Sequence, residues 1–466
     1  MSAVGPTVPE PTMSACIPNN RLRTRLWPLL TSVVLVVSGV AFCFLWSPIV
    51  RHQTGWVQPG DLWGTYRAAQ YVGWGDIGDI YQGGTGFISL PGIAVLLAPM
   101  TILADHLGLS PSFPYALPHP SAWLVLCPVS LAVGVLPFFA LDAVVEYLET
   151  SRGVRILLCW GQMVLLWPVL VIWGHPEDAI ALGFALYGLL AAWKRRWRAT
   201  GWLFGLAVLF QPLVVLMLPI TFALFPSTRQ RLYCLVRVVS PSAVLLIIPL
   251  VQSWGAVTYA LVKQPTFPAL NHKTPLLFLA PVIGHVDAST RALFLRQGTV
   301  GRFVTVTNPG GAVVVAPGLG RLIAVALAVL VGVWVWRRRS DPAQTLWLSA
   351  LVLCVWCAFE PVMTPYYPWP ALALLLAGGG LAPRWRMAAI AAAGVFASIW
   401  AEHYFGPWVW YGPIMLALVI ALWCARPGSI RDRSSVSPLA AQPASGRTGP
   451  EPGHREEEQL RAQSSS

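Results

Sequence analysis

Long apolar stretches alternate with short polar, Arg-rich stretches along most of the chain. The first apolar stretch runs from Leu26 to Val50 and follows Arg21, Arg23 and Arg25. As a helix it would cross about 30 Å of hydrocarbon, and it is too long for the apolar core of a signal peptide. Further apolar stretches cover residues 87–103, 122–145, 156–174, 179–193, 202–225, 234–254, 322–336, 345–359, 369–381, 387–400 and 408–425. The pattern predicts an all-α polytopic membrane protein.

Composition excludes the main soluble classes. The 466 residues are 56% hydrophobic and only 11% charged, whereas soluble domains carry roughly 25% charged residues. Too little polar surface exists to cover a soluble core, and too little charge exists for a disordered chain. The net charge of +12 is therefore interpreted as a signal of membrane topology, and we expect no nucleic-acid partner.

Basic clusters between the apolar stretches predict which ends face the cytoplasm. They occupy residues 194–198, 229–237, 337–339, 384–386 and 426–433, and Lys and Arg favour the cytoplasmic side. To keep all of them on one side, stretch 87–103 must be a juxtamembrane or re-entrant helix in the first external loop. Stretch 202–225 must cross twice, with a break at Gln211-Pro212, since Pro breaks a helix. The result is about 12 transmembrane helices, with both termini in the cytoplasm.

The polar ends of the chain define the domain boundaries. Residues 1–20 are expected to form a disordered cytoplasmic N-terminus and residues 427–466 a disordered cytoplasmic tail, because both are rich in polar residues and Pro. Residues 21–426 form the transmembrane domain, and residues 255–321 a long external segment. We expect a multi-pass protein of the plasma membrane.

The cysteines carry no metal or redox signature. Cys354 and Cys357 have the Cys-x-x-Cys spacing, but they lie inside an apolar stretch. Zinc and disulfide frameworks need cysteines in aqueous loops. These two cysteines are therefore predicted to be small buried core residues.

Ionisable residues gather in the segments assigned to the external side. A transporter would place more of them at mid-membrane, so this distribution favours an enzyme at the outer interface. In the first external loop, Asp61 precedes an aromatic, amphipathic helix over residues 62–71 that contains Arg67. Asp61 has two interpretations from spacing alone. It is a general base that deprotonates a hydroxyl, or it caps the following helix.

Four features together resemble the GT-C superfamily of membrane glycosyltransferases, and within it glycosyltransferase family 87. They are the acidic residue Asp61 in the first external loop, the juxtamembrane helices, the Gly-His-acid loop at 174–178 and the broken helix at 205–212. The resemblance covers roughly residues 21–425. It implies transfer of mannose from a polyprenyl-phosphate donor to a glycolipid or glycan acceptor on the outer face. Asp61 is then the catalytic base, and neither a cofactor nor a metal is expected.

The resemblance also implies substrate-binding positions. Tyr366 and Tyr367 stand where the family often has Trp-x-His-His, and Gln211 stands where it has Lys before Pro. Tyrosine can donate hydrogen bonds to phosphate but carries no positive charge at neutral pH. In the Gly-His-acid loop, His175, Glu177 and Asp178 either bind substrate or, in the case of the two acids, offset the dipole of the next helix.

An inverting transfer with a phosphate leaving group needs one base and nearby cations. Among the external cations we favour His272 and Lys273, with Arg67 as a further candidate. The alternative interpretation is a basic loop that contacts anionic membrane lipid. Two other functions remain open, namely a transporter or flippase of a lipid-linked sugar and a catalytically inactive membrane scaffold.

Overall fold

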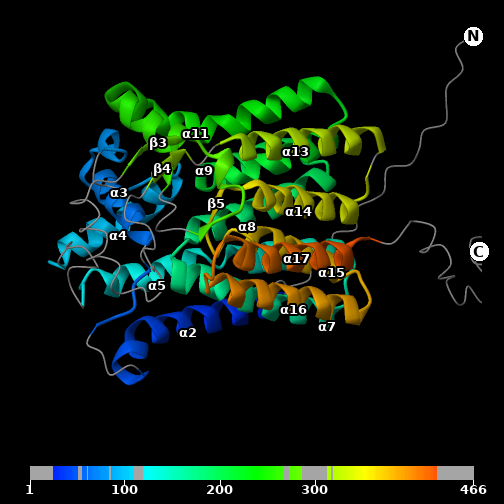
Figure 1. Cartoon of the computed structure of the whole chain (residues 1–466), viewed down its shortest axis with the longest axis horizontal. Helices are drawn as coiled ribbons and strands as arrows, with labels where there is room; N and C mark the ends of the chain where they lie inside the picture. The colour runs from blue at the N-terminus through cyan, green and yellow to red at the C-terminus, as the bar shows by residue number, and fades with distance from the viewer. Residues whose placement is uncertain are drawn as a thin grey trace, which may run out of the picture. The chain divides into compact units, whose positions relative to one another are not determined.

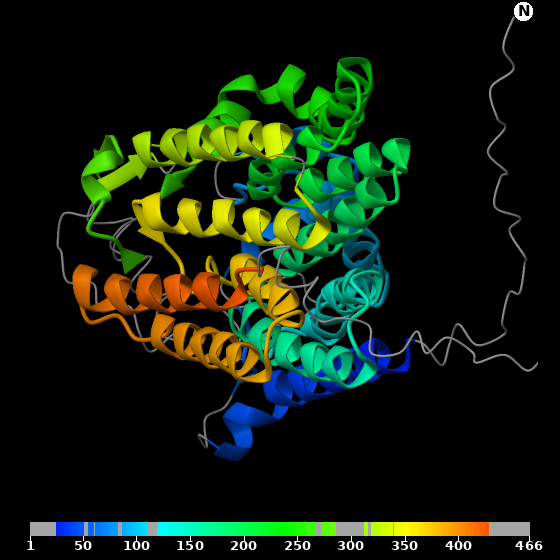
Figure 2. The same ribbon diagram turned by 90° about the vertical axis from the view of Figure 1, so that its right-hand side faces the viewer.

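The fold is known from a computed structural model, which describes residues 25–50, 55–59, 61–82, 86–109, 119–266, 272–285, 312–315, 318–338 and 340–427. These residues are mainly helical, as the apolar pattern predicted (Figures 1 and 2). The two tails expected to be disordered lie outside the described residues, apart from Pro427.

Seven helical segments in the described part of the chain are long and apolar enough to cross a membrane. They are α2 (Leu26–Val50), the pair α5 (Trp123–Val133) and α6 (Leu136–Tyr147), α7 (Arg152–Pro168) with the π-turn η2 (Val169–Trp173), α11 (Thr228–Val257) with the π-turn η4 (Thr258–Lys263), α13 (Leu319–Arg338), α14 (Pro342–Phe359) and α17 (Pro407–Ala425). Their length and composition support the predicted class, a helical membrane protein.

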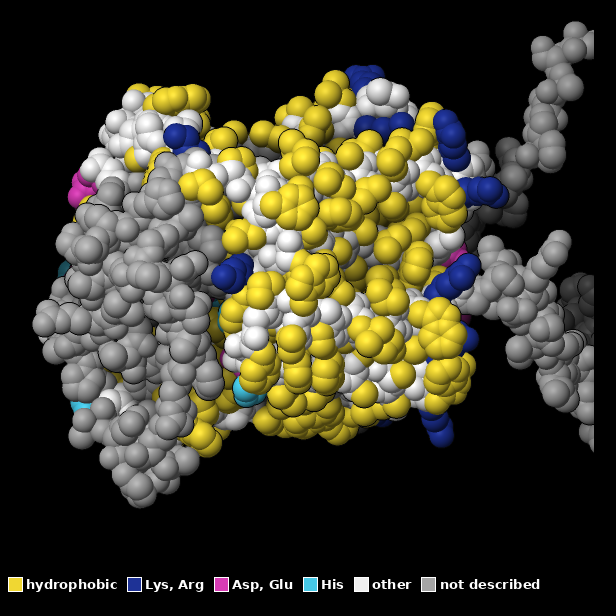
Figure 3. Space-filling model, in the orientation of Figure 1, with side chains coloured by type: hydrophobic (Ala, Val, Ile, Leu, Met, Phe, Trp, Pro, Cys, Tyr) yellow, Lys and Arg dark blue, Asp and Glu magenta, His cyan; other side chains and the backbone are white. Residues whose placement is uncertain are grey.

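Further helices complete the bundle. They are α8 (Pro176–Trp193), α9 (Trp197–Phe210), η3 (Pro212–Met217), α10 (Leu218–Ala223), α15 (Trp369–Gly379) and α16 (Arg384–Ala401). In the face seen in Figure 3, hydrophobic side chains cover the sides of the helices, while Lys and Arg gather near the right-hand end. This separation is what helices embedded in a lipid layer require.

A network of four charges joins three helices at this basic end. Arg25, just before α2, and Arg155 on α7 each pair with Asp142 and Glu146 on α6. Arg155 lies 2.8 Å from Asp142, whose side chain is only 3% exposed. A buried carboxylate in an apolar segment is costly unless it is paired. These pairs therefore fix the starts of α2 and α7 beside the end of α6.

The predicted break between residues 202 and 225 is confirmed. Helix α9 ends at Phe210, and Gln211 has extended dihedral angles (φ −143°, ψ 112°) before the chain turns into η3 and α10. Pro212 has no amide hydrogen to continue the helix. The chain therefore forms two short helices at this point instead of one continuous span.

Two predicted stretches differ in detail from the structure, although residues 123–147 still form one candidate span. Stretch 122–145 is divided into α5 and α6 at Gly134, where a Cβ would lie 2.6 Å from the Leu170 side chain. The predicted external segment 255–321 begins within a helical piece, because helix resumes after Ser253, whose dihedral angles are non-helical (φ −143°, ψ 49°), and continues through η4 to Lys263. The predicted end at residue 254 lies beside this kink, where Gln252 and Ser253 interrupt the apolar run.

Helices α3 (Leu62–Trp74) and α4 (Gly92–His106) pack against each other at the end of the bundle opposite the basic end (Figure 1). The start of α4 approaches the end of α9 closely. A Cβ at Gly92 would lie 2.7 Å from the Leu209 carbonyl oxygen. The start of α4 therefore packs directly against the end of α9, next to the break at Gln211.

Short strands were not predicted from the sequence. Strands β1 (Pro265–Thr266), β4 (Ala312–Val315) and β3 (Val282–His285) form one antiparallel sheet, and β2 (His272–Lys273) pairs with β5 (Val362–Met363). The second pair joins a segment before α13 to the segment after α14. It therefore holds His272 and Lys273 close to the loop that carries Tyr366 and Tyr367.

Candidate functional site

Asp61 points toward another helix instead of capping its own. Its backbone is helical (φ −73°, ψ −22°), and its side chain makes no capping hydrogen bond to α3. Its Oδ2 atom lies 3.1 Å from Nε2 of His175, and half of the side chain is exposed. The capping interpretation is therefore wrong, and the carboxylate remains accessible beside an imidazole.

His175 lies in the corner between η2 and α8. Gly174 forms this corner with a positive φ of 72°, a conformation that glycine adopts without strain. A Cβ there would collide with Pro59 and would lie 3.0 Å from Leu62 Cβ. The absence of a side chain at Gly174 thus allows His175 to approach the start of α3, where Asp61 is located.

Both ring nitrogens of His175 face carboxylates. Nδ1 lies 2.6 Å from Oε1 of Glu177, in the first turn of α8. Burial alone would lower the pKa of His175, but the negative charges of Glu177 and Asp61 raise it well above its usual value. The imidazole is therefore positively charged at neutral pH. It also stacks on Tyr366, with ring centroids 3.8 Å apart, an arrangement that favours a cation.

The break at Gln211 is joined to the same site. The Gln211 amide donates a hydrogen bond to the Asp178 carboxylate, which lies beside Glu177 and is 5% exposed. Residues from α3, the η2–α8 corner, the α9–η3 break and the loop before α15 therefore meet. We call this the outer polar cluster, after the external side predicted for its residues from the sequence, and it consists of Asp61, His175, Glu177, Asp178, Gln211 and Tyr366.

Tyr366 and Tyr367 are neutral at physiological pH. Burial raises the pKa of both phenols above their usual value. The two rings meet edge to face at 5.2 Å. They can therefore supply hydrogen bonds but no charge, as the sequence indicated.

A second ion pair nearby was not predicted. Arg321, at the start of α13, lies 2.8 Å from Glu360, which follows α14 and is fully buried. Arg321 also donates to the Gln264 side chain. The only signal in the sequence is a single charge at the edge of each apolar stretch, and 39 residues separate the two.

His272 is packed among aromatic side chains. Its ring stacks on Tyr404 at 4.9 Å and meets Trp410 at 4.6 Å. Burial lowers its pKa to about 4, so His272 supplies no positive charge at neutral pH, contrary to our expectation. Lys273 lies next to it on β2, opposite Val362. Arg67 lies over the Trp63 ring on α3, 5.0 Å from its centroid.

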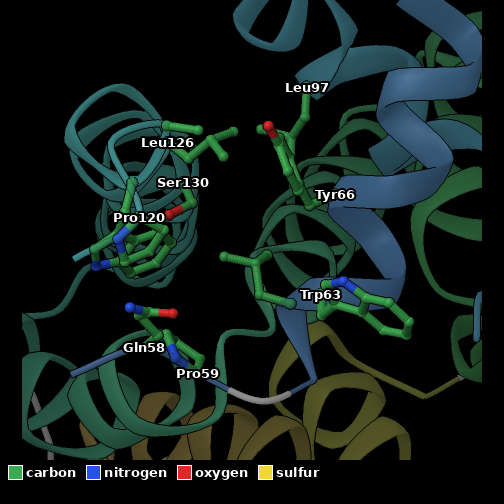
Figure 4. A pocket seen from close by; sticks show the side chains of 11 residues that line it. Gln58, Pro59, Trp63, Tyr66, Leu97, Pro120, Leu126 and Ser130 are labelled. Atoms are coloured by element: carbon green, nitrogen blue, oxygen red, sulfur yellow. The ribbon is translucent and has the colours of Figure 1, made fainter. Parts of the chain in front are cut away.

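A largely apolar pocket lies between α3 and α5 (Figure 4). We call it the α3–α5 pocket, and it encloses about 470 Å³ including its open mouth. It is lined by Gln58, Pro59, Leu62, Trp63, Tyr66, Leu97, Pro120, Ala122, Trp123, Leu126 and Ser130. Pro59 and Leu62 closely flank Asp61 in the sequence, so the pocket and the outer polar cluster are adjacent.

The described residues contain no group of three or more His, Cys, Asp or Glu side chains arranged to hold a metal ion. Cys354 and Cys357 are free thiols buried in α14, as the sequence predicted.

Comparisons of the chain with protein-family models, curated proteins and solved structures gave no match. The resemblance to family 87 therefore stays a prediction from the motifs.

Proposed function

We propose that this protein is an integral-membrane glycosyltransferase with a GT-C-like arrangement of about 12 transmembrane helices. It transfers a sugar, mannose by resemblance, from a polyprenyl-phosphate donor to a glycolipid or glycan acceptor on the extracytoplasmic face. The observation that carries the proposal is the Asp61–His175–Glu177 array beside the apolar α3–α5 pocket.

Contacts among basic and aromatic side chains support the proposed orientation. Lys194 lies over Tyr147, Arg231 over Trp336, and Arg386 over Trp423. The ends of helices far apart in the sequence therefore meet on one basic side, which the positive-inside rule assigns to the cytoplasm. Both termini then lie in the cytoplasm of a plasma-membrane protein, and the outer polar cluster lies on the opposite side.

Asp61 acts as the general base in this proposal. His175 engages Oδ2, so Oδ1 is the oxygen that takes the proton from an acceptor hydroxyl. The hydroxyl oxygen bonds to the anomeric carbon as the bond from that carbon to the phosphate oxygen breaks. The electron pair leaves with the polyprenyl phosphate, and the configuration at the anomeric carbon inverts.

The protonated His175 has two roles. It orients Asp61 through a hydrogen bond, and it places one positive charge near the position where the leaving phosphate gains negative charge. Glu177 in turn holds the imidazole from the other side. Tyr366, stacked on His175, has a phenol that can donate to a phosphate oxygen.

The α3–α5 pocket suits a polyprenyl chain. Its lining is mostly aliphatic and aromatic, and among its described lining residues there is no Asp, Glu, Lys or Arg. Isoprenoid units bury apolar area in such a pocket and gain roughly 25 cal/mol per Å². A donor seated there would present its phosphate and sugar close to Asp61.

The test is transfer from polyprenyl-phosphate-mannose by the purified protein in proteoliposomes. Asp61→Asn keeps the side-chain size but cannot accept the proton, so the rate should fall by about 10²–10⁴-fold. Asp76→Asn is the matched control, because Asp76 is an exposed carboxylate beyond the opposite end of α3 that makes no capping bond. Full turnover of the Asp61→Asn protein would exclude the proposed base.

A further inference from the structure

Two cysteines that are far apart in the sequence, Cys43 on α2 and Cys127 on α5, come together inside the bundle. Their side chains are only 1% and 0% exposed, and the two thiols hydrogen-bond to each other. Both carry free thiols in the structure. No motif in the sequence joins them, and the proposed mechanism gives them no role, so their contact requires an explanation of its own.

The packing of α2 against α5 accounts for the contact. The helices are antiparallel, because Arg25 at the start of α2 pairs with α6, the continuation of α5, whereas Gly39 lies against Leu131 on α5. A Cβ at Gly39 would lie 2.8 Å from Leu131 Cδ1, so the two helices approach too closely here for a side chain. Cys43 follows Gly39 by one helical turn, and Cys127 precedes Leu131 by one turn. In an antiparallel pair, these two positions face each other.

This arrangement meets the geometric requirement of a disulfide bond. Bonded cysteines have Cα atoms about 4.4–6.8 Å apart, with side chains directed toward each other. Helices α2 and α5 lie side by side, and their Cα atoms come within 8 Å of each other (Figure 1). The thiols of Cys43 and Cys127 are already in contact, so closing the bond needs only a small approach of the two side chains.

The pair lies toward the external end of both helices in the proposed orientation. Cys43 is about 26 Å from the start of α2 at the helical rise of 1.5 Å per residue, close to the full thickness of the hydrocarbon layer. Cys127 lies in the first two turns of α5. Disulfide bonds form and persist on the oxidising, extracytoplasmic side of a membrane. This step rests on the proposed orientation but not on the transferase activity.

The pair also connects two walls of the α3–α5 pocket. The backbone oxygen of Cys43 accepts a 2.8 Å hydrogen bond from the Val57 amide, and the next residue, Gln58, lines the pocket. On the other side, Leu126 lines the pocket directly before Cys127. A bond between the two cysteines would therefore hold α5 beside the segment that leads into α3.

We propose that Cys43 and Cys127 form a disulfide bond that fastens α2 to α5 beside the α3–α5 pocket. The oxidant is the disulfide of an extracytoplasmic thiol oxidoreductase. The thiolate of one cysteine attacks this disulfide and releases one of its sulfurs as a thiolate. The thiolate of the second cysteine then attacks the mixed disulfide, so that the new bond forms and the oxidant leaves as a dithiol. Because both side chains are buried in the folded bundle, this exchange takes place before α5 packs against α2.

The bond is tested by mass spectrometry of the full chain from cell membranes. The membranes are dissolved in dodecyl sulfate with excess N-ethylmaleimide and no reductant, so that every free thiol is capped before air can oxidise it. Digestion with pepsin at acid pH keeps thiol–disulfide exchange slow. The peptides that contain Cys43 and Cys127 should be joined and should separate only after reduction. Cys159, Cys234 and Cys424, buried thiols on α7, α11 and α17, are internal controls and should carry the maleimide.

Two variants identify the partners. Cys43→Ser should leave Cys127 modified by maleimide, whereas Cys159→Ser should leave the bond intact. Maleimide on both Cys43 and Cys127 in the wild type would overturn the inference, as would a bond from either residue to another cysteine.

A second measurement tests whether the bond fastens the helices. Protein from cells treated with dithiothreitol during synthesis should lack the bond and should melt at a lower temperature than protein from untreated cells, because a cross-link restricts the unfolded chain. Equal melting temperatures would contradict the fastening role. None of these measurements requires sugar transfer, so the inference and the proposed function can fail separately.

Discussion

Asp61 and His175 are separated by 114 residues in the sequence, yet Oδ2 of the first lies 3.1 Å from Nε2 of the second. From the sequence alone, each segment also has a purely structural interpretation. Asp61 could cap the helix that follows it, and the acids beside His175 could offset the dipole of the next helix. The contact gives them a joint explanation, because the carboxylate orients and charges the imidazole while the imidazole leaves one carboxylate oxygen for chemistry.

The raised pKa of His175 predicts a pH dependence of stability. The folded protein binds the proton more tightly than the unfolded chain, whose imidazole has a pKa of about 6.5. The stabilisation should therefore be complete below pH about 6 and be lost as the pH rises through the folded pKa. Melting temperatures in detergent between neutral and alkaline pH should show this decline. His175→Gln should remove it, and a decline of equal size in that variant would contradict the assignment.

Gly174→Ala should destabilise the protein. Its positive φ costs an alanine about 1–2 kcal/mol, and the new methyl group would collide with Pro59. Thermal unfolding should therefore occur at a lower temperature, and transfer should fall because the corner positions His175. Gly153→Ala provides the control, because Gly153 has open space around it near the start of α7. It should leave the melting temperature unchanged or slightly higher.

Removal of Arg321 should be more harmful than removal of the whole ion pair. Arg321→Met leaves the fully buried Glu360 carboxylate without its cation, which costs about 3–5 kcal/mol. Adding Glu360→Gln removes the buried charge and should restore much of that loss. A double-mutant cycle of unfolding free energies measures the coupling. Additive effects would show that the two side chains act independently.

The proposed orientation can be checked by cysteine labelling in intact cells. A cysteine at His403 should react with a membrane-impermeant maleimide added outside, whereas one at Arg198 should not, because Arg198 belongs to a basic cluster. Both positions are exposed, and the native cysteines in the described residues are buried, so background labelling should be low. Reaction of the Arg198 position from outside would contradict the predicted number of crossings.

The local features of the fold follow from the sequence. Apolar length predicts the helices, and Pro212 predicts the break after Gln211, because both depend on residues close together in the chain. The Arg321–Glu360 pair and the β2–β5 pairing depend on distant segments that approach each other only when the bundle forms. The aromatic surroundings of His272 are of this kind, which is why the expected cation is neutral.

For the candidate site, the sequence indicated which residues take part but not which of them contact one another. Asp61, His175, Glu177, Asp178, Gln211 and Tyr366 were all selected from motifs, and the structure brings them together. Cys43 and Cys127 received no role, because single cysteines in separate apolar stretches have no local pattern. Only the packing of α2 against α5 makes them neighbours.

The charge network at the basic end has a consequence for biogenesis. Arg25 directly precedes α2, and its partners Asp142 and Glu146 are synthesised more than a hundred residues later. Until these partners have been made, Arg25 is therefore an uncompensated charge. Once α6 has followed, Asp142 and Glu146 neutralise the Arg25 guanidinium, so a charge that is unpaired during synthesis becomes part of the contact that joins α2 to the assembled bundle.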